Sequence, residues 1–245
     1  MSYFAFRGYT SEQLGLIITR PMIRPTWQPE IEFTPIIGRA RLNPFTKSYY
    51  NNIKLTVSAV ITDAARDNMR LIYNVLRGYG TLRISTAENE CVNAYCRLPV
   101  PEPQALLMAE LPIEFECVPF AYDLTRYGAD LTEATSYIEI NNRGTVFTDP
   151  EIRFCPNKTS TVFDCNGKTI TITTPQAIVT ASYSTDYSVT LDCDGEIAYY
   201  TTPAGANIGC TELTNGSFPR LNSGRNVIKH NGITEGTMLY YERYY

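Results

Sequence analysis

The sequence offers one histidine for catalysis or metal binding, His230, which precedes the turn-forming pair Asn231-Gly232. A nucleophile that depends on a histidine base would have to use this single imidazole. A zinc site with two histidine ligands is excluded. A histidine at the end of a strand, next to a turn, is ordinarily a surface residue. We therefore expect His230 to have no catalytic role.

Two sets of alternating acidic residues have a spacing that calcium binding or acid–base chemistry would use. They are Asp192, Asp194 and Glu196, and Glu114 and Glu116. The first set lacks the further oxygen ligands of a calcium loop, and Asp194-Gly195 is typical of a hairpin turn. The second set could be the carboxylate pair of a glycosidase. The two glutamates alternate with apolar residues, however, which places both carboxylates on a face turned to solvent or to another subunit. We expect both sets to be structural.

Neither a nucleotide site nor a metal site is indicated by the remaining motifs. The chain contains no GxxxxGK[ST] loop and no GxGxxG turn between a strand and a helix. The 7 cysteines are scattered without a CxxC pair, and Cys91 and Cys96 stand at positions of opposite parity on a strand. Reduced, mostly buried thiols are the expected state. We expect no enzyme and no cofactor.

Composition and charge favour a folded β-rich protein that binds neither nucleic acid nor membrane. Hydrophobic residues make up 44% of the 245 residues, charged residues 19%, and Tyr is frequent at 18. Residues 1–127 carry 13 basic and 12 acidic side chains, a net of +1, and residues 128–245 carry 8 and 13, a net of −5. Neither half has a basic stripe for phosphate. The start does not resemble a signal peptide and no apolar run is long enough for a membrane span, so we expect folding in the cytoplasm.

The first half is expected to be a β domain with one helix. Alternation over Leu55–Ile61 and Leu111–Val118 predicts half-buried strands, and further strands are expected at Thr81–Thr86 and Val92–Leu98. A helix of about 14 residues should start after Thr62 or Asp63 and end where Gly78 and Gly80 adopt left-handed conformations. Residues 119–136 lack periodicity and are expected to form a connector.

Residues 20–48, which precede the strand at Leu55, contain five prolines. These prolines exclude a helix and disfavour a central strand. We expect an extended arm, an irregular hairpin whose apolar residues pack against something else. A neighbouring subunit is one such partner.

The second half is expected to be an antiparallel sandwich without a helix. Three turn signals separate β-prone segments: Asn166-Gly167, Asp194-Gly195 and Asn231-Gly232. The expected strands are Thr169–Thr173, Ile178–Tyr183, Tyr187–Leu191, Ile197–Thr201, Val227–His230 and Met238–Tyr244. Short strands with regular turns indicate a sandwich.

Several segments, in order along nearly the whole chain, resemble the distal tail (Dit) proteins of siphophages and prophages. They are Phe6-Arg7-Gly8-Tyr9-Thr10-Ser11 with Leu14-Gly15-Leu16-Ile17-Ile18, Ile37-Gly38-Arg39, Tyr49-Tyr50-Asn51-Asn52-Ile53, Leu76-Arg77-Gly78-Tyr79-Gly80, Phe115-Glu116-Cys117-Val118-Pro119-Phe120, Asn142-Arg143-Gly144-Thr145 with Pro150-Glu151-Ile152, and Phe218-Pro219-Arg220-Leu221 with Gly224-Arg225-Asn226-Val227-Ile228. The last resembles the F-P-x-L-x-x-G-x-N-x-I signature of that family. The family often has a second glycine just after Gly38, where this chain has Ala40-Arg41. The arm tip is where the resemblance is weakest.

The resemblance implies a fold, an assembly and a place in the virion. Residues 1–127 would form a belt domain related to tail-tube proteins, and residues 128–245 a peripheral galectin-like sandwich. Six copies would close into a ring around the DNA channel, joining the tail tube above to the tail-associated or baseplate protein below. The implied location is the tail tip of a virion. DNA would pass through this ring without specific binding, and no membrane or cofactor is involved.

The ring contacts are expected on the arm at residues 20–48 and on the polar edges of the first domain, with Trp27, Ile36 and Ile37 as buried interface anchors. Burial of these residues in the chain's own core is the alternative.

Two other functions fit the sequence. One is a carbohydrate- or host-binding baseplate module, with tyrosines at 199–200 and 240–241 available to stack on sugars. The other is the tail-tube subunit, which shares the belt-type fold but assembles into long tubes.

Overall fold

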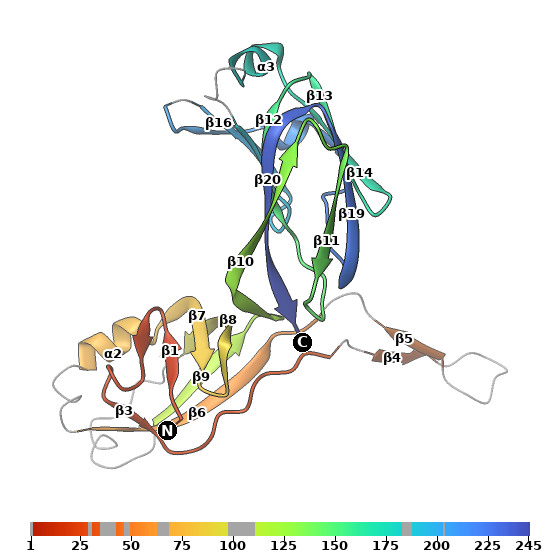
Figure 1. The fold of residues 1–245 in the computed structure, drawn as a ribbon. Coiled ribbons are helices and arrows are strands. Elements are labelled where there is room, and N and C mark those ends of the chain that lie inside the picture. Colours follow the sequence, from red (N-terminus) through yellow and green to blue (C-terminus); the bar gives the residue numbers. More distant parts are fainter. Residues whose placement is uncertain are drawn as a thin grey trace. The chain divides into compact units, whose positions relative to one another are not determined.

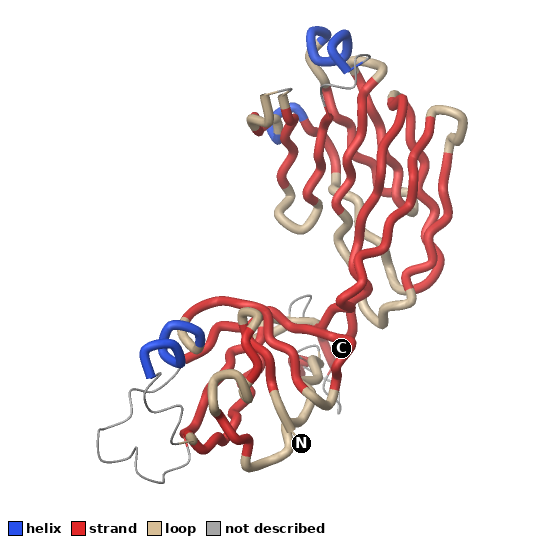
Figure 2. The backbone as a smooth tube through the Cα atoms, turned by 60° about the vertical axis from the view of Figure 1, so that its left-hand side comes forward, coloured by secondary structure: helices blue, strands red, loops and turns tan. Residues whose placement is uncertain are grey.

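The computed structural model describes residues 2–28, 31–34, 43–46, 50–62, 69–97, 111–182, 188–202 and 204–245, with the backbone alone for 31–34, 43–46, 181 and 182. The chain divides into two compact units, the first comprising Met1–Leu124 with Tyr245 and the second Thr125–Tyr244. Strands, red in Figure 2, make up most of both units. The mainly β fold class predicted from the sequence is confirmed.

The first unit is built on an antiparallel sheet (Figure 1). In pairing order its strands are β2 (Tyr9–Thr10), β1 (Phe4–Phe6), β7 (Gly78–Ile84), β8 (Ala87–Arg97), β9 (Leu111–Cys117), β6 (Ile53–Ile61) and β3 (Leu16–Ile18). The strand predicted at Leu111 is confirmed, and its alternate residues are buried as expected. The rings of Phe4 and Phe6 pack edge-on against Phe115, with centroids 5.4 and 5.3 Å away. These aromatic contacts form the centre of the unit's apolar core.

The predicted helix is present as α2 (Met69–Val75), and its expected first part, residues 63–68, lies outside the described residues. Gly78 follows it at φ +98°, the left-handed conformation expected there. Gly80 does not adopt that conformation, so this expectation was wrong. A Cβ at Gly80 would come 2.4 Å from Cγ of Arg7. Gly80 therefore allows close packing instead of ending the helix.

Part of the proline-rich arm is a hairpin, β4 (Ile31–Thr34) with β5 (Asn43–Thr46). The two strands are antiparallel, with Ile31 opposite Thr46 and Thr34 opposite Asn43. Among the described strands, β4 and β5 pair only with each other. The hairpin that the sequence predicted is therefore present, as a two-stranded sheet separate from the sheets of both units.

The second unit is a sandwich of two antiparallel sheets, as predicted (Figure 1). One sheet contains, in pairing order, β17 (Asn207–Gly209), β16 (Ile197–Thr201), β15 (Ser188–Asp192), β12 (Glu151–Pro156), β20 (Ile233–Tyr244) and β10 (Ala121–Thr132). The other contains β11 (Tyr137–Asn142), β19 (Gly224–Asn231), β13 (Ser160–Cys165), β14 (Lys168–Thr173) and β18 (Thr214–Gly216). Phe154 of the first sheet meets Phe163 of the second edge-on, with centroids 5.1 Å apart. The core lies between the two layers.

A helix, α3 (Gln176–Ser182), replaces the strand that the sequence predicted from Ile178. A run of Ile, Val and Thr favours a strand. Pro175 decides otherwise, because its carbonyl accepts from the backbone N–H groups of Ile178 and Val179, at 2.9 and 3.2 Å. Proline at the start of a segment is pre-organised for a helix. The expectation of no helix in this half was wrong.

A strand of 12 residues, β10, runs through the segment that was expected to be a connector. Its first half, as far as Arg126, shows no alternation, but Tyr127, Ala129 and Leu131 alternate with exposed residues and pack in the core, so the expectation of no periodicity was wrong there. Backbone pairing defines the strand: Tyr122 lies opposite Cys91 of β8 in the first unit, and β20 flanks it in the second. Strands β11, β12 and β13 were also absent from the predicted set.

The three turn signals have three different outcomes. Asn166 and Gly167 have φ of +54° and +84° and join the paired strands β13 and β14, as expected for a tight hairpin. At the Asp194-Gly195 hairpin the residue with positive φ is Glu196, at +51°. Gly232 connects strands of opposite sheets, so the predicted hairpin there was wrong. A Cβ on Gly232 would come 2.6 Å from the carbonyl oxygen of Ser160, and this close approach requires glycine.

Candidate functional site

His230 is buried in the second unit, with 8% of its surface exposed, and is not the surface residue expected from the sequence. It follows Asn226 and Ile228 along the inward face of β19, and its ring centroid lies 6.4 Å from that of Phe163. Burial lowers the pKa of this imidazole. No hydrogen-bond partner for its Nε2 is found among the described residues. The structure therefore makes His230 a core residue rather than a catalytic base.

The acidic run at the β15–β16 hairpin is engaged in structural contacts. Oδ1 of Asp192 accepts the backbone N–H of Gly195 at 3.2 Å. Oδ1 of Asp194 lies 2.7 Å from Nη2 of Arg243. Two of the three carboxylates therefore make contacts within the unit, which is compatible with the expected structural role.

The carboxylates of Glu114 and Glu116 lie on the outward face of β9, as expected from the alternation. Glu116 accepts Nδ2 of Asn52 at 3.1 Å and lies 3.3 Å from Nη2 of Arg97. Glu114 lies opposite Arg97 in the strand register. Basic and amide groups therefore surround this pair on an open sheet face.

Trp27, predicted to be an interface anchor, is 2% exposed and belongs to the core of the first unit. Its ring lies 6.5 Å from that of Phe120, at an interplanar angle of 61°. This burial corresponds to the alternative that the sequence left open, and contact with a neighbouring chain remains a prediction. Ile36 and Ile37 lie outside the described residues.

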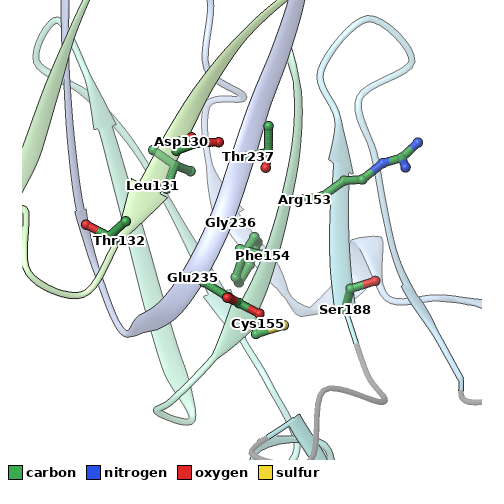
Figure 3. A pocket seen from close by; sticks show the side chains of 10 residues that line it. All are labelled: Asp130, Leu131, Thr132, Arg153, Phe154, Cys155, Ser188, Glu235, Gly236 and Thr237. Atoms are coloured by element: carbon green, nitrogen blue, oxygen red, sulfur yellow. The ribbon is translucent and has the colours of Figure 1, made fainter.

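A groove of about 390 Å³, with both polar and apolar lining, lies on the outer face of the second unit's larger sheet (Figure 3). Strands β10, β20, β12 and β15 supply its polar groups, which are Asp130, Thr132, Arg153, Cys155, Ser188, Glu235 and Thr237. The strand register brings them together. Thr237 lies opposite Arg153, and Glu235 lies opposite Cys155. Figure 3 shows Thr237 between Asp130 and Arg153 in this view, as the strand order requires.

Four polar side chains of the groove have no hydrogen-bond or ion-pair partner in the part of the chain that the structure describes. Among the described residues, no hydrogen bond or ion pair engages the side chains of Asp130, Ser188, Glu235 and Thr237. Arg153 donates through Nε to Oε1 of Glu151. Sequence analysis missed this cluster because it missed β10 and β12. The usable signal was the alternation of buried Ile152 and Phe154 with Arg153 and Cys155.

A second hollow of about 390 Å³, at one end of the sandwich, is lined mainly by groups that already have partners, although Nε2 of His230 has none among the described residues. Nδ2 of Asn157 donates to Oε1 of Glu133 and to the carbonyl of Ile233, each at 3.0 Å. Nζ of Lys158 donates to Oδ1 of Asn231 at 3.0 Å. These bonds hold the turns of the sandwich together, so the groove is the stronger candidate for a ligand.

The described part of the chain contains no group of three or more His, Cys, Asp or Glu side chains placed to hold a metal ion. All seven cysteines are free thiols, and six of them are buried. Burial raises the pKa of Cys96 and Cys117 to about 12, which keeps these thiols protonated at neutral pH. No helix in the described residues is long and apolar enough to span a membrane.

Two solved structures resemble this chain over nearly its whole length. The Dit protein (gp 19.1) of phage SPP1, described as a paradigm of the hub adsorption apparatus in phages that infect Gram-positive bacteria, has a TM-score of 0.72 at 14% identity, covering 100% of both chains. The fold is that of a Dit protein. The second, from the phage P2 baseplate in its activated conformation with Ca, has a TM-score of 0.60 at 8% identity, covering 99% of this chain and 98% of the other.

No protein-family model matches the sequence, and no curated protein matches it significantly. The likeness to the Dit and baseplate structures is therefore one of fold. It includes both units, since each alignment covers essentially the full length of both proteins. The fold expected from the sequence motifs is confirmed.

Proposed function

We propose that this chain is a structural, non-enzymatic protein of a phage tail tip. The observation that carries this proposal is the full-length likeness to SPP1 Dit, a protein of the hub adsorption apparatus. A shared fold alone does not determine function. Here the likeness extends over two units in the same order, and the sequence motifs indicate the same family independently.

In this role, six copies form a ring around the DNA channel, between the tail tube above and the tail-associated or baseplate protein below. Head-to-tail contacts that close by rotation produce such rings. The net charge is compatible with a DNA channel. Six chains of −4 each give a ring of −24, which repels phosphate rather than gripping it.

The two units divide this work. Residues 1–127 form the ring as a belt domain, and residues 128–245 form the peripheral sandwich. The compact units divide between Leu124 and Thr125, within β10. The sandwich architecture of the second unit supports its assignment as the galectin-like domain.

The arm at residues 20–48 supplies ring contacts, with Ile36 and Ile37 as interface anchors, whereas Trp27 is buried in the core of its own unit. The support comes from the hairpin of β4 and β5, which pairs with no other described strand. Apolar residues on a segment with little core of its own are stabilised by a partner surface.

Native mass spectrometry of the purified chain, with negative-stain images, tests the assembly. A hexamer, or two hexameric rings stacked back to back, is the expected result. Long tubes would identify the chain as a tail-tube subunit. A monomer at high concentration, and also in the presence of the tail proteins made from neighbouring genes, would contradict the ring and favour a binding module.

The arm is tested by Ile37→Asp, which places a charge where an apolar contact is proposed. We expect a soluble monomer. The matched control is Ile197→Asp, since Ile197 is 47% exposed on β16 of the second unit. This control should still form rings. Rings formed by Ile37→Asp would remove the proposed anchor without affecting the assignment of the fold.

A further inference from the structure

We infer that the groove on the outer face of β10, β20, β12 and β15 is a binding site for a neutral saccharide. The groove belongs wholly to the second unit, since all of its lining residues lie between Asp130 and Thr237. This function is additional to the structural role and does not depend on ring assembly. A groove of about 390 Å³ is within the usual size range of small-ligand sites, about 300–1,000 Å³.

The chemistry of the free groups matches a ligand rich in hydroxyls. Asp130 and Glu235 supply carboxylate acceptors, Thr237 and Ser188 supply hydroxyls that donate and accept, and Arg153 supplies donors. A sugar hydroxyl is both a donor and an acceptor, so it can satisfy each of these kinds of group. An apolar ligand would leave them unpaired at a cost in free energy.

Arg153 is the cationic donor at the edge of the groove (Figure 3). Its Nε is held by Oε1 of Glu151, and the other carboxylate oxygen of Glu151 accepts Nη2 of Arg126 at 2.8 Å. This hydrogen bond to Nε fixes the orientation of the guanidinium group. Among the described residues, its two Nη groups have no partner and remain available to a ligand. Hydrogen bonds from a charged donor are the stronger kind.

Charge favours a neutral ligand over an anionic one. The groove contains two carboxylates, Asp130 and Glu235, and one cation, Arg153. That cation is already paired with Glu151. A phosphate or carboxylate group in the groove would therefore meet a surplus of negative charge, which opposes binding.

The strand register also places an aromatic ring beside the groove. Arg153 lies opposite Thr190, and Thr190 lies opposite Tyr199. Residues paired across antiparallel strands share a face, so Tyr199 stands on the groove side, two strands beyond Arg153. Tyr199 is half-buried. A ring in this position offers a flat apolar surface to the C–H face of a second sugar unit.

The test is saturation-transfer NMR with titration on the full-length chain. The probes are the methyl glycosides of galactose, glucose and N-acetylglucosamine and their β-linked disaccharides, with poly(glycerol phosphate) as the anionic comparison. We expect saturable binding of at least one neutral probe and none of the phosphate polymer. Arg153→Gln should weaken that binding at least about tenfold, the loss expected for one charged hydrogen bond. Asp130→Asn should weaken it in the same direction.

The matched control is Arg225→Gln, which removes an arginine that is also paired with a glutamate, Glu139, but on the opposite sheet. This variant should bind like the unmodified chain. Thermal melts show whether each variant is folded. If Arg153→Gln does not fold, the isosteric Asp130→Asn variant tests the groove in its place. Absence of binding to every neutral probe, binding of the phosphate polymer alone, or undiminished binding by the folded groove variants would each overturn the inference. None of these results bears on ring formation, which is measured separately by native mass spectrometry.

Discussion

Arg243 donates from Nη1 to Oδ2 of Asp149 at 2.9 Å, and only 7% of the aspartate side chain is exposed. The same carboxylate accepts Nε of Arg220 at 2.7 Å through Oδ1. Nη2 of Arg243 reaches Asp194 at the β15–β16 hairpin. The Asp149–Arg243 pair therefore links β20, the start of β12 and a distant turn within the second unit. These ion pairs hold the three segments of the sandwich in place.

Asp149→Asn should lower the free energy of unfolding by about 2 kcal/mol, because two arginines lose a charged acceptor in a mostly buried position. Urea denaturation at pH 7 followed by circular dichroism measures this change. Glu139→Gln is the control, since its pair with Arg225 is exposed, and it should leave the midpoint unchanged. An equal loss in both variants would show that burial of Asp149 adds nothing.

Gly144→Ala should destabilise the second unit by about 2 kcal/mol, the usual cost of overpacking. A Cβ at this position would come 2.4 Å from the carbonyl oxygen and 2.7 Å from the nitrogen of Arg243, and backbone atoms cannot easily move away. Gly209→Ala is the control, since a Cβ there meets nothing within 4 Å. Thermal melts compare the two variants, and a melting temperature for Gly144→Ala equal to that of the control would contradict the close approach.

Stability should fall with pH below about 6.5 because of His230. Burial lowers the pKa of His230 in the folded chain, so the unfolded chain takes up this proton first as the pH falls. Above the unfolded pKa the imidazole is neutral in both states and contributes no pH dependence. Urea midpoints at pH 7.5 and 5.5 measure the loss.

His230→Leu should show a smaller decrease between these two pH values, because its side chain does not titrate. The comparison isolates the histidine from the carboxylates, which titrate in both proteins. An identical decrease in the two proteins would mean that His230 does not gain a preference for the neutral form on folding.

Cys155 should be the cysteine that alkylates first in the folded chain, because it is half-buried while the other six cysteines are buried. Burial, and then the charge of Glu235, raises the pKa of Cys155, so the reaction should be slow at neutral pH and faster above it. Iodoacetamide labelling followed by peptide mass spectrometry measures the order of reaction. All seven thiols should react in urea, and a buried thiol such as Cys193 that reacts as fast in the folded state would contradict the description of the core.

Local patterns were sufficient for much of the fold. The alternation in β9, the helix ending before Gly78 and the positive φ values at Asn166 and Gly167 all follow from properties of neighbouring residues. The motifs ordered along the chain indicated the Dit fold, which the full-length structural likeness confirms. These features depend on side-chain periodicity and backbone preference, which are determined by residues close together in the sequence.

The tertiary structure decided what depends on distant partners. Strand β10 is defined by its pairing with β8 and β20, because only its second half, from Tyr127, shows an alternation of its own. The groove forms only when Asp130, Arg153 and Glu235, which are far apart in sequence, meet on neighbouring strands. His230 is buried because β19 turns the same face inward along its length and Phe163 covers the ring. Burial and strand pairing are properties of the assembled layers, so no local pattern contains them.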